Sequence, residues 1–245
     1  AALLNACGGG SATAPDAEPF YLEEEEEWSL VWSDEFDGSA VDSGNWTFQL
    51  GDGSDNGLPG WGNYELQYYQ ADNASIQEVD DTTALVIEAR QEDAGNSAYT
   101  SARMRSVNKF DFKYGRVDIR AKAAPGDGMW SAVWMMPTDT TYGTWAAGGE
   151  IDIMEVVNAG TDNQGVFMAA HYGFEWPLNQ ITSEGADVSD ATDWHTYSLE
   201  WSGDYLRWFS GQFAADDLTY IGAPVKCEGH TMGTVCSMYS GGGLE

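Results

Sequence analysis

Apolar and polar residues alternate along many short segments between Trp28 and about Phe209. In residues 116–122 the apolar side chains fall on one face and the charged ones on the other, and residues 195–201 alternate in the same way. Because side chains two apart share a face of an extended strand, this period predicts β-strands. Further strands are predicted at residues 85–90, 129–136, 150–157, 166–172 and 205–209.

Gly, Asp and Asn separate these segments, and no long stretch shows a helical period. Many strands without helices between them predict an all-β protein, an antiparallel β-sandwich or jelly roll with a concave face that holds the substrate. A chain of 245 residues commonly forms one such domain, which we expect over residues 28–212.

One predicted strand carries three acids in the sequence Glu-Ile-Asp-Ile-Met-Glu at 150–155. Glu150 and Asp152 lie two apart and share a face, whereas strict alternation would turn Glu155 to the opposite face. A β-bulge near Ile153 or Met154 would return Glu155 to the first face, and bulges are frequent beside active sites. The sequence therefore predicts a bulged strand that lines one groove with carboxylates.

Such a cluster has a chemical use, because neighbouring acids raise one another's pKa values. A sugar hydrolase needs one ionised carboxylate and one protonated carboxylic acid near neutral pH. We predict Glu150 as the nucleophile, Glu155 as the general acid and then base, and Asp152 as the group that holds Glu150. A calcium site and a solvated, charged edge strand are the alternatives from the residues alone.

The amino-acid composition limits the classes of molecule that this protein is expected to bind. The chain has 40 acidic and 10 basic residues, a formal charge of −30 that repels nucleic acids and anionic membrane surfaces. Salt would screen this self-repulsion, so a saline habitat is a hypothesis. The 11 Trp exceed what a core of this size needs, so some are expected to line a sugar-binding surface while others pack in the core.

The segment at 150–155 resembles the active-site signature of glycoside hydrolase family 16. Other segments resemble the bacterial laminarinases of that family in the same order, and the resemblance covers about residues 28–212. They lie at residues 32–38, 62–69, 115–117, 128–137, 171–173 and 194–201.

This resemblance implies a jelly roll, retention of anomeric configuration, endo-hydrolysis of β-1,3-glucan such as laminarin, and no cofactor for catalysis. The spacing Glu-x-Asp-x-x-Glu is similar to that of laminarinases, carrageenases and agarases, whereas lichenases have one residue fewer. Few basic residues disfavour sulfated carrageenan. Agar, mixed-linkage glucan, a non-catalytic β-glucan-binding module and a calcium-dependent structural or adhesion domain stay as alternatives, and we expect a monomer.

The resemblance also implies which residues contact the glycan. For His171 the alternative is a packed strand histidine, and Trp176 is the weakest candidate. A structural calcium is implied near residues 34–38, with Glu35 as the side-chain ligand. The expected glycan contacts are Trp61, Asn63, Glu65, Arg103, Trp130, Trp134, His171 and Trp176.

Both ends of the chain differ from the domain between them. Residues 4–7, Leu-Asn-Ala-Cys, resemble a bacterial lipobox, so Cys7 would carry a lipid and residues 8–27 would be a flexible acidic tether. This predicts an extracytoplasmic protein, secreted or anchored to the outer membrane by that lipid. Cys227 and Cys236 could close a small disulfide loop. Residues 213–245 depart from the family pattern, and its closing strands are expected to be missing or altered.

Overall fold

The protein is described by a computed structural model that covers residues 28–211, 219–226 and 236–244. Cys7, the predicted tether and Cys227 lie outside the described residues, so the predicted lipid anchor and disulfide remain predictions. The chain divides into two units, residues 1–32 and 33–245. All strands and helices of the described residues belong to the second unit.

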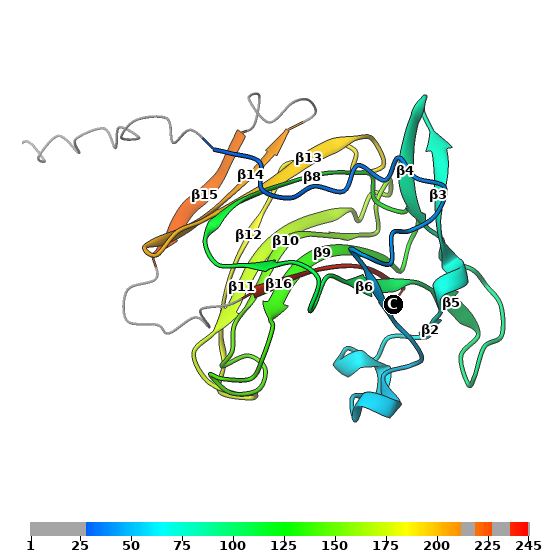
Figure 1. Ribbon diagram of the computed structural model, residues 1–245, viewed down its shortest axis with the longest axis horizontal. Helices are drawn as coiled ribbons and strands as arrows, with labels where there is room; N and C mark the ends of the chain where they lie inside the picture. The colour runs from blue at the N-terminus through cyan, green and yellow to red at the C-terminus, as the bar shows by residue number, and fades with distance from the viewer. Residues whose placement is uncertain (1–27, 212–218, 227–235, 245) are drawn as a thin grey trace, which may run out of the picture. The chain divides into compact units, whose positions relative to one another are not determined.

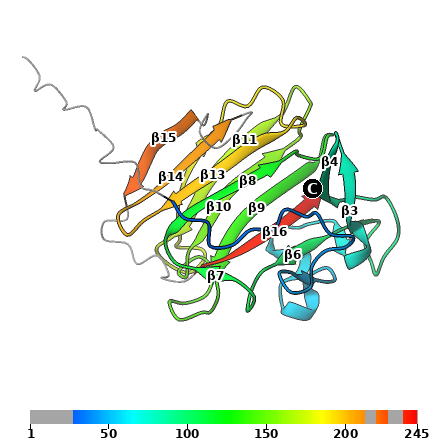
Figure 2. The same ribbon diagram turned by 45° about the horizontal axis from the view of Figure 1, so that its top comes forward.

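The larger sheet has eight antiparallel strands. Figure 2 shows its central strands, with β16 in red between β6 and β9. β7, Asp111–Phe112, pairs with β16 beside the main path. In spatial order the other strands are β1 (Thr47–Gln49), β6 (Arg103–Arg105), β16 (Cys236–Leu244), β9 (Met129–Pro137), β10 (Glu150–Val157), β11 (Gly165–Tyr172) and β12 (Gln180–Gly185).

A second antiparallel sheet of four strands covers one face of the larger sheet (Figure 1). Its order is β15 (Thr219–Lys226), β14 (Tyr205–Gly211), β13 (His195–Trp201) and β8 (Gly115–Ala121). Two small pairs complete the strands: β2 (Gln67–Tyr69) runs parallel to β5 (Tyr99–Ser101), and β3 (Ala74–Val79) forms a hairpin with β4 (Thr82–Ile87).

Helix in the described residues is limited to three short 3-10 turns, η1 (Ser54–Asn56), η2 (Pro59–Gly62) and η3 (Ala71–Asn73). In this part of the chain no helix is long and apolar enough to span a bilayer. The predicted all-β sandwich is confirmed.

The core lies between the two sheets, where the apolar residues of the alternating strands meet. Ile151 and Ile153 of β10 are fully buried, as are Leu199 of β13 and Leu206 of β14. Their alternation with Asp152 separates the two faces of β10, so the face away from this core is left for the acids. This is the arrangement that the sequence pattern predicted.

The geometry of the β3–β4 hairpin explains why β4 begins three residues earlier than the strand predicted from the sequence. A strand was predicted at residues 85–90, whereas β4 is Thr82–Ile87. Asp80 and Asp81 both have positive φ, 51° and 63°, so they form the tight turn that a two-residue hairpin needs. Pairing with β3 then begins directly at Thr82.

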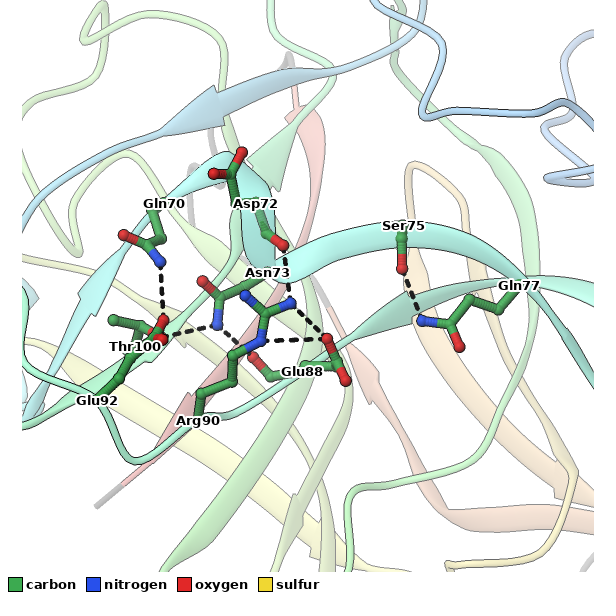
Figure 3. Close-up of polar contacts among 9 residues, drawn as sticks. All are labelled: Gln70, Asp72, Asn73, Ser75, Gln77, Glu88, Arg90, Glu92 and Thr100. Carbon is green, nitrogen blue, oxygen red and sulfur yellow. Dashed lines mark hydrogen bonds and ion pairs between the residues drawn. The ribbon is translucent and has the colours of Figure 1, made fainter.

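A buried polar network ties this hairpin to β5 (Figure 3). Asn73 is fully buried, and its Nδ2 donates to the Glu88 carbonyl oxygen at 2.8 Å and to Thr100 Oγ1 at 2.9 Å. Thr100 Oγ1 in turn donates to Glu92 Oε1 at 2.7 Å. Because β5 pairs with β2, the network supports the segment that leads into the functional site.

The C-terminal strands are altered in sequence but are present. Residues 213–245 lack the alternation of a half-buried strand, yet β15 pairs with β14 and β16 pairs with β6, β7 and β9. Ladder hydrogen bonds join main-chain groups, so a Gly-rich segment can take a place in a sheet without an alternating pattern. Of the two outcomes expected for the closing strands, missing or altered, the structure shows the second: strands are present at Thr219–Lys226 and Cys236–Leu244 in a segment of altered sequence. The predicted domain boundaries stay predictions.

Candidate active site

The predicted bulge lies in β10, directly after Asp152. On the β11 side Asp152 is opposite Ala169 and Glu155 is opposite Phe167, so three steps along β10 match two along β11. On the β9 side the register also shifts between Asp152 and Met154. The extra residue returns Glu155 to the face of Glu150 and Asp152, as the sequence predicted.

Partners on the neighbouring strands hold the three acids on this face. His171 of β11 is opposite Glu150, and its Nε2 lies 3.3 Å from Asp152 Oδ2. Trp130 of β9 donates from Nε1 to Glu155 Oε1 at 3.1 Å. The two strands beside β10 therefore contact different acids of the cluster: β11 contacts Asp152 and β9 contacts Glu155.

Burial and mutual repulsion raise the pKa values of all three acids. Burial, followed by the charge of Asp152, raises the pKa of Glu150 to about 8. Burial, followed by the charge of Glu155, raises the pKa of Asp152 well above its usual range. Burial also raises the pKa of Glu155, against the hydrogen bond from Trp130 and the charge of His171. Burial therefore favours the protonated form of each of the three acids.

Trp145, which the sequence analysis did not select, contacts the cluster from the loop before β10. Its Nε1 donates to Glu150 Oε2, and its ring lies 5.5 Å from that of His171 and 6.0 Å from that of Trp176. The hydrogen bond lowers the pKa of Glu150 and so opposes the effect of burial. The donor thus favours the ionised form of this one acid.

A second group of side chains surrounds Arg103 of β6. The guanidinium carbon lies 4.6 Å from the Trp61 ring centroid and 4.7 Å from that of Trp134, both within cation–π range. Arg103 Nη1 is 3.7 Å from Glu65 Oε1, and Nε donates to Gln49 Oε1 at 3.0 Å. The guanidinium is therefore fixed from several sides.

Glu65 is satisfied by donors from its own segment. Gln67 Nε2 donates to Glu65 Oε2 at 2.9 Å, and the Tyr69 hydroxyl donates to the same oxygen at 2.6 Å. Asn63 Nδ2 lies 3.4 Å from Glu65 Oε1. Residues 65, 67 and 69 alternate along β2 and its approach, which brings all three side chains to one face.

Trp134 connects the two groups. On β9 it is the residue opposite Asp152, and its ring contacts the Arg103 guanidinium. Residues directly opposite each other in adjacent strands project from the same face of a sheet. The carboxylate cluster and the Arg103 group therefore lie on one face of the larger sheet.

Residues 63–240 match the family described as Glycosyl hydrolases family 16. The match runs past the predicted domain end at Gln212 and includes β15 and part of β16. The chain belongs to glycosyl hydrolase family 16.

Similar proteins support this family 16 assignment. The chain is 38% identical over 203 residues to Glucan endo-1,3-beta-glucosidase A1 of Niallia circulans, covering 76% of this chain and 29% of that protein. It is 38% identical over 209 residues to Beta-glucanase of Rhodothermus marinus, covering 80% of this chain and 66% of that protein. The chain thus spans less than two thirds of the length of either relative.

The fold matches a solved family structure. The laminarinase catalytic domain of Thermotoga maritima MSB8 aligns with a TM-score of 0.76 and 33% identity, over 89% of this chain and 88% of that one. The jelly-roll fold predicted from the sequence is therefore confirmed.

The structure brings several of the residues predicted to contact the glycan together around Arg103. Glu65, Arg103 and Trp134 contact one another, and Asn63 lies beside them. Trp61 is only 5% exposed, because it packs edge-on against Tyr69 and lies beneath Arg103, so it supports the site from below. Trp61 therefore exposes little surface to a ligand, and its predicted glycan contact stays a prediction.

The remaining predicted residues lie nearer the acids. Trp130 is half-buried and bonded to Glu155, and His171 contacts Asp152. Trp176 is 69% exposed, and its ring contacts that of Trp145. These positions fit contacts to a ligand lying over β9, β10 and β11.

Several contributors were missed because their signal is weak in sequence. Gln67 and Tyr69 alternate with Glu65, a pattern that could have been followed two residues further. Phe167 is opposite Glu155 and 41% exposed. Its signal in the sequence is an aromatic residue at a strand position that alternation turns outwards. Trp145 has none, because loop geometry alone brings it to Glu150.

The predicted calcium site finds little support in the described residues. Asp34 already accepts hydrogen bonds from Phe36 N at 3.0 Å, Asn45 Nδ2 at 3.0 Å and Trp46 Nε1 at 2.8 Å. Glu35 is exposed, and no group of three or more acids, histidines and cysteines in the described part of the chain could hold a metal ion. These residues do not fit a side-chain calcium cage, and no catalytic step is assigned to a metal.

Proposed function

We propose that this family 16 domain hydrolyses internal β-1,3 linkages of a neutral glucan and retains the anomeric configuration. The observation that carries the proposal is the bulge in β10, which brings Glu150, Asp152 and Glu155 to one face with raised pKa values. The names of the similar proteins support a β-glucan, and the excess of 40 acidic over 10 basic residues disfavours a sulfated sugar.

In the first step, the Glu150 carboxylate attacks the anomeric carbon, and the proton of Glu155 passes to the departing glycosidic oxygen. The bond between that carbon and oxygen breaks, and a glycosyl ester forms on Glu150. In the second step, Glu155, now ionised, takes a proton from water while the water oxygen attacks the same carbon and releases Glu150. Two inversions at one carbon retain its configuration.

The surroundings act on the nucleophile in opposite directions. Burial and the charge of Asp152 raise the pKa of Glu150 to about 8, which disfavours the attacking carboxylate, whereas His171 and Trp145 oppose this shift. The Trp145 indole stabilises the ionised form of Glu150, which the attack requires. Burial holds a proton on the cluster, which the departing oxygen requires. Asp152 lies beside both glutamates and His171, so it can share a proton with Glu150 as the charge on that residue changes.

The Arg103 group supplies polar and aromatic contacts for the sugar on the same face. A glucan presents hydroxyl groups and flat apolar C–H faces, and Trp134 with the charged pair of Arg103 and Glu65 offers a partner for each. Because Trp134 is opposite Asp152, a sugar bound there lies next to the reacting carbon.

The test is incubation with laminarin, lichenan and agarose, followed by measurement of new reducing ends. We expect cleavage of laminarin with long oligosaccharides appearing first, and Glu150→Ala should abolish cleavage while laminarin binding survives. Glu78→Gln, at an exposed acid of β3, is the matched control and should retain full activity. Wild-type protein that binds laminarin without producing reducing ends would instead be a glucan-binding module.

Retention is tested separately by proton NMR of the first products. The β-anomer should appear before mutarotation begins. Initial appearance of the α-anomer would exclude the double displacement.

A further inference from the structure

The bulge in β10 sets which face of the sheet each following side chain of the strand points to, so its position must be fixed. A slip by one residue turns every following side chain to the other face of a sheet. Without the extra residue after Asp152, Glu155 would point into the core and Val156 towards the substrate. The spacing between the acids therefore depends on what fixes the backbone at Asp152.

One hydrogen bond from the opposite sheet reaches this backbone. Trp208 of β14 is 2% exposed, and its Nε1 donates to the main-chain carbonyl oxygen of Asp152 at 2.9 Å, inside the core. Asp152 is the last residue before the register shift on both the β9 and the β11 side. The indole thus binds β10 where its ladder becomes irregular.

Trp208 is itself held at a defined position. Its backbone is opposite Leu199 of β13, and the pairing of β14 with β15 shifts register between Leu206 and Trp208. Irregularities of this kind re-aim side chains. Two irregular points, one in each sheet, thus meet at a single hydrogen bond.

We propose that Trp208 is a positioning residue for catalysis, which fixes the bulge and thereby the placement of Glu155 relative to Glu150 and Asp152. This inference rests on the proposed hydrolase function. Trp208 touches no reacting atom, and it acts only through the Asp152 carbonyl. The nearby Trp201 of β13 is the useful contrast, because it is equally buried but packs on Phe112 and Tyr114.

The proposed role of Trp208 depends on its N–H donor, whereas ordinary core packing depends on the buried apolar area of the ring. Replacing the indole by another apolar ring keeps most of the buried area but removes the N–H donor. The bulge can then relax, which misplaces Glu155 relative to the anomeric carbon and changes the repulsion among the acids. Small misplacements of reacting groups can lower rates by about 10²-fold. The Arg103 group lies on other strands, so substrate binding should change little.

The experiment compares Trp208→Phe with Trp201→Phe in the full chain. A third protein carries benzothienylalanine at position 208, introduced by site-specific incorporation, which keeps the shape of the indole but lacks the N–H. For each we measure kcat, KM and the pH dependence of both on laminarin. Both changes at Trp208 should lower kcat about 10- to 100-fold, leave KM within about threefold and shift the pH profile. Trp201→Phe should keep the wild-type pH profile, with kcat within about threefold.

The inference is overturned if both proteins changed at 208 match Trp201→Phe in kcat and pH profile. If Trp208→Phe does not fold, the benzothienylalanine protein decides the question alone. If the wild type cleaves no glucan, the proposed function fails. The inference then rests on carbon NMR titration of the side-chain carboxyls: altered pKa values for Asp152 and Glu155 on loss of the N–H support it, and unchanged values refute it.

Discussion

Two carboxylates of this protein, Glu65 and Glu150, are both largely withdrawn from water but have opposite surroundings. Glu65 receives the Tyr69 hydroxyl and the Gln67 amide and lies 3.7 Å from the Arg103 guanidinium. Glu150 has Asp152 and Glu155 as acidic neighbours, while His171 and the Trp145 indole lower its pKa. The first environment suits a charge that stays, whereas the second suits a charge that appears and disappears during a reaction.

The largest test exchanges each acid for its amide. Glu150→Gln should lower kcat on laminarin by about 10³-fold or more, because the proposed nucleophile is lost. Glu65→Gln should retain measurable turnover but lose stability, because Arg103 keeps a weaker partner and the Tyr69 hydroxyl a poorer acceptor. Reducing-end assays and denaturant unfolding of both variants check this contrast. The comparison breaks if Glu65→Gln is as inactive as Glu150→Gln while it remains folded.

The pH dependence of stability sharpens the same contrast. The pKa of Glu150 rises from an ordinary 4.5 to about 8 in the folded protein, so the folded state holds a proton that the unfolded state has released between these values. Stability from this group is therefore complete below about pH 4.5 and is lost as the pH rises towards 8. Glu150→Gln should thus gain stability relative to the wild type across this window. Urea unfolding at several pH values measures it, and a constant difference would contradict the raised pKa.

Substitutions of Arg103 test the surroundings of Glu65, whose charge this guanidinium balances. Arg103→Leu leaves Glu65 without its cation and removes the contacts to Trp61 and Trp134. We expect a loss of about 2 kcal/mol in the free energy of unfolding, and a KM about tenfold higher with a smaller change in kcat. Arg103→Lys should recover part of the stability but little of the KM, since an ammonium cannot replace a planar fork between two rings. A normal KM in both variants would place the glycan elsewhere.

Trp145→Phe should have a smaller effect on activity, through the surroundings of Glu150. Loss of the indole donor removes an interaction that lowers the pKa of Glu150, so that pKa should rise further. The acidic limb of kcat/KM against pH should move to higher pH, and the rate at neutral pH should fall by about tenfold or less. A shift of the acidic limb to lower pH would mean that Glu150 is not the group that must be ionised.

The smallest effect on activity is expected at Asn73, in the network of Figure 3. Asn73→Ala removes two hydrogen bonds made by the buried Nδ2, at about 1 kcal/mol each. Thermal unfolding should detect this loss, while kcat on laminarin should stay within about twofold at a temperature where the variant is folded. A large fall in kcat would show that the β3–β4 hairpin influences the site.

The sequence predicted those parts of the molecule that follow from a strand's period. The alternation in residues 150–157 indicated both the buried face of β10 and the odd position of Glu155, and the bulge is found where it was expected. The contacts of Arg103 came only through the family resemblance. The roles of Glu150 and Glu155 stay predictions until activity is measured.

Contacts made through loops and between sheets could not be predicted in this way. Trp145 reaches Glu150 through the path of a Gly-rich loop, and Trp208 reaches Asp152 across the core from a different sheet. Neither relation appears as a period along the chain. The strands of the C-terminal segment escaped prediction for another reason, since main-chain pairing places β16 in the sheet without a side-chain pattern.

The position of β16 also has a consequence for synthesis of the protein. β16, Cys236–Leu244, lies between β6, which carries Arg103, and β9, which is next to β10 with its three acids. A ribosome makes the chain from its N-terminus, so both flanking strands emerge long before the strand that joins them. Until residue 244 has been made, β6 and β9 each present an open edge, which invites pairing with other chains. A nascent chain stalled before β16 should therefore depend on chaperones and lack glucan hydrolysis, although every residue of the carboxylate cluster has already been synthesised.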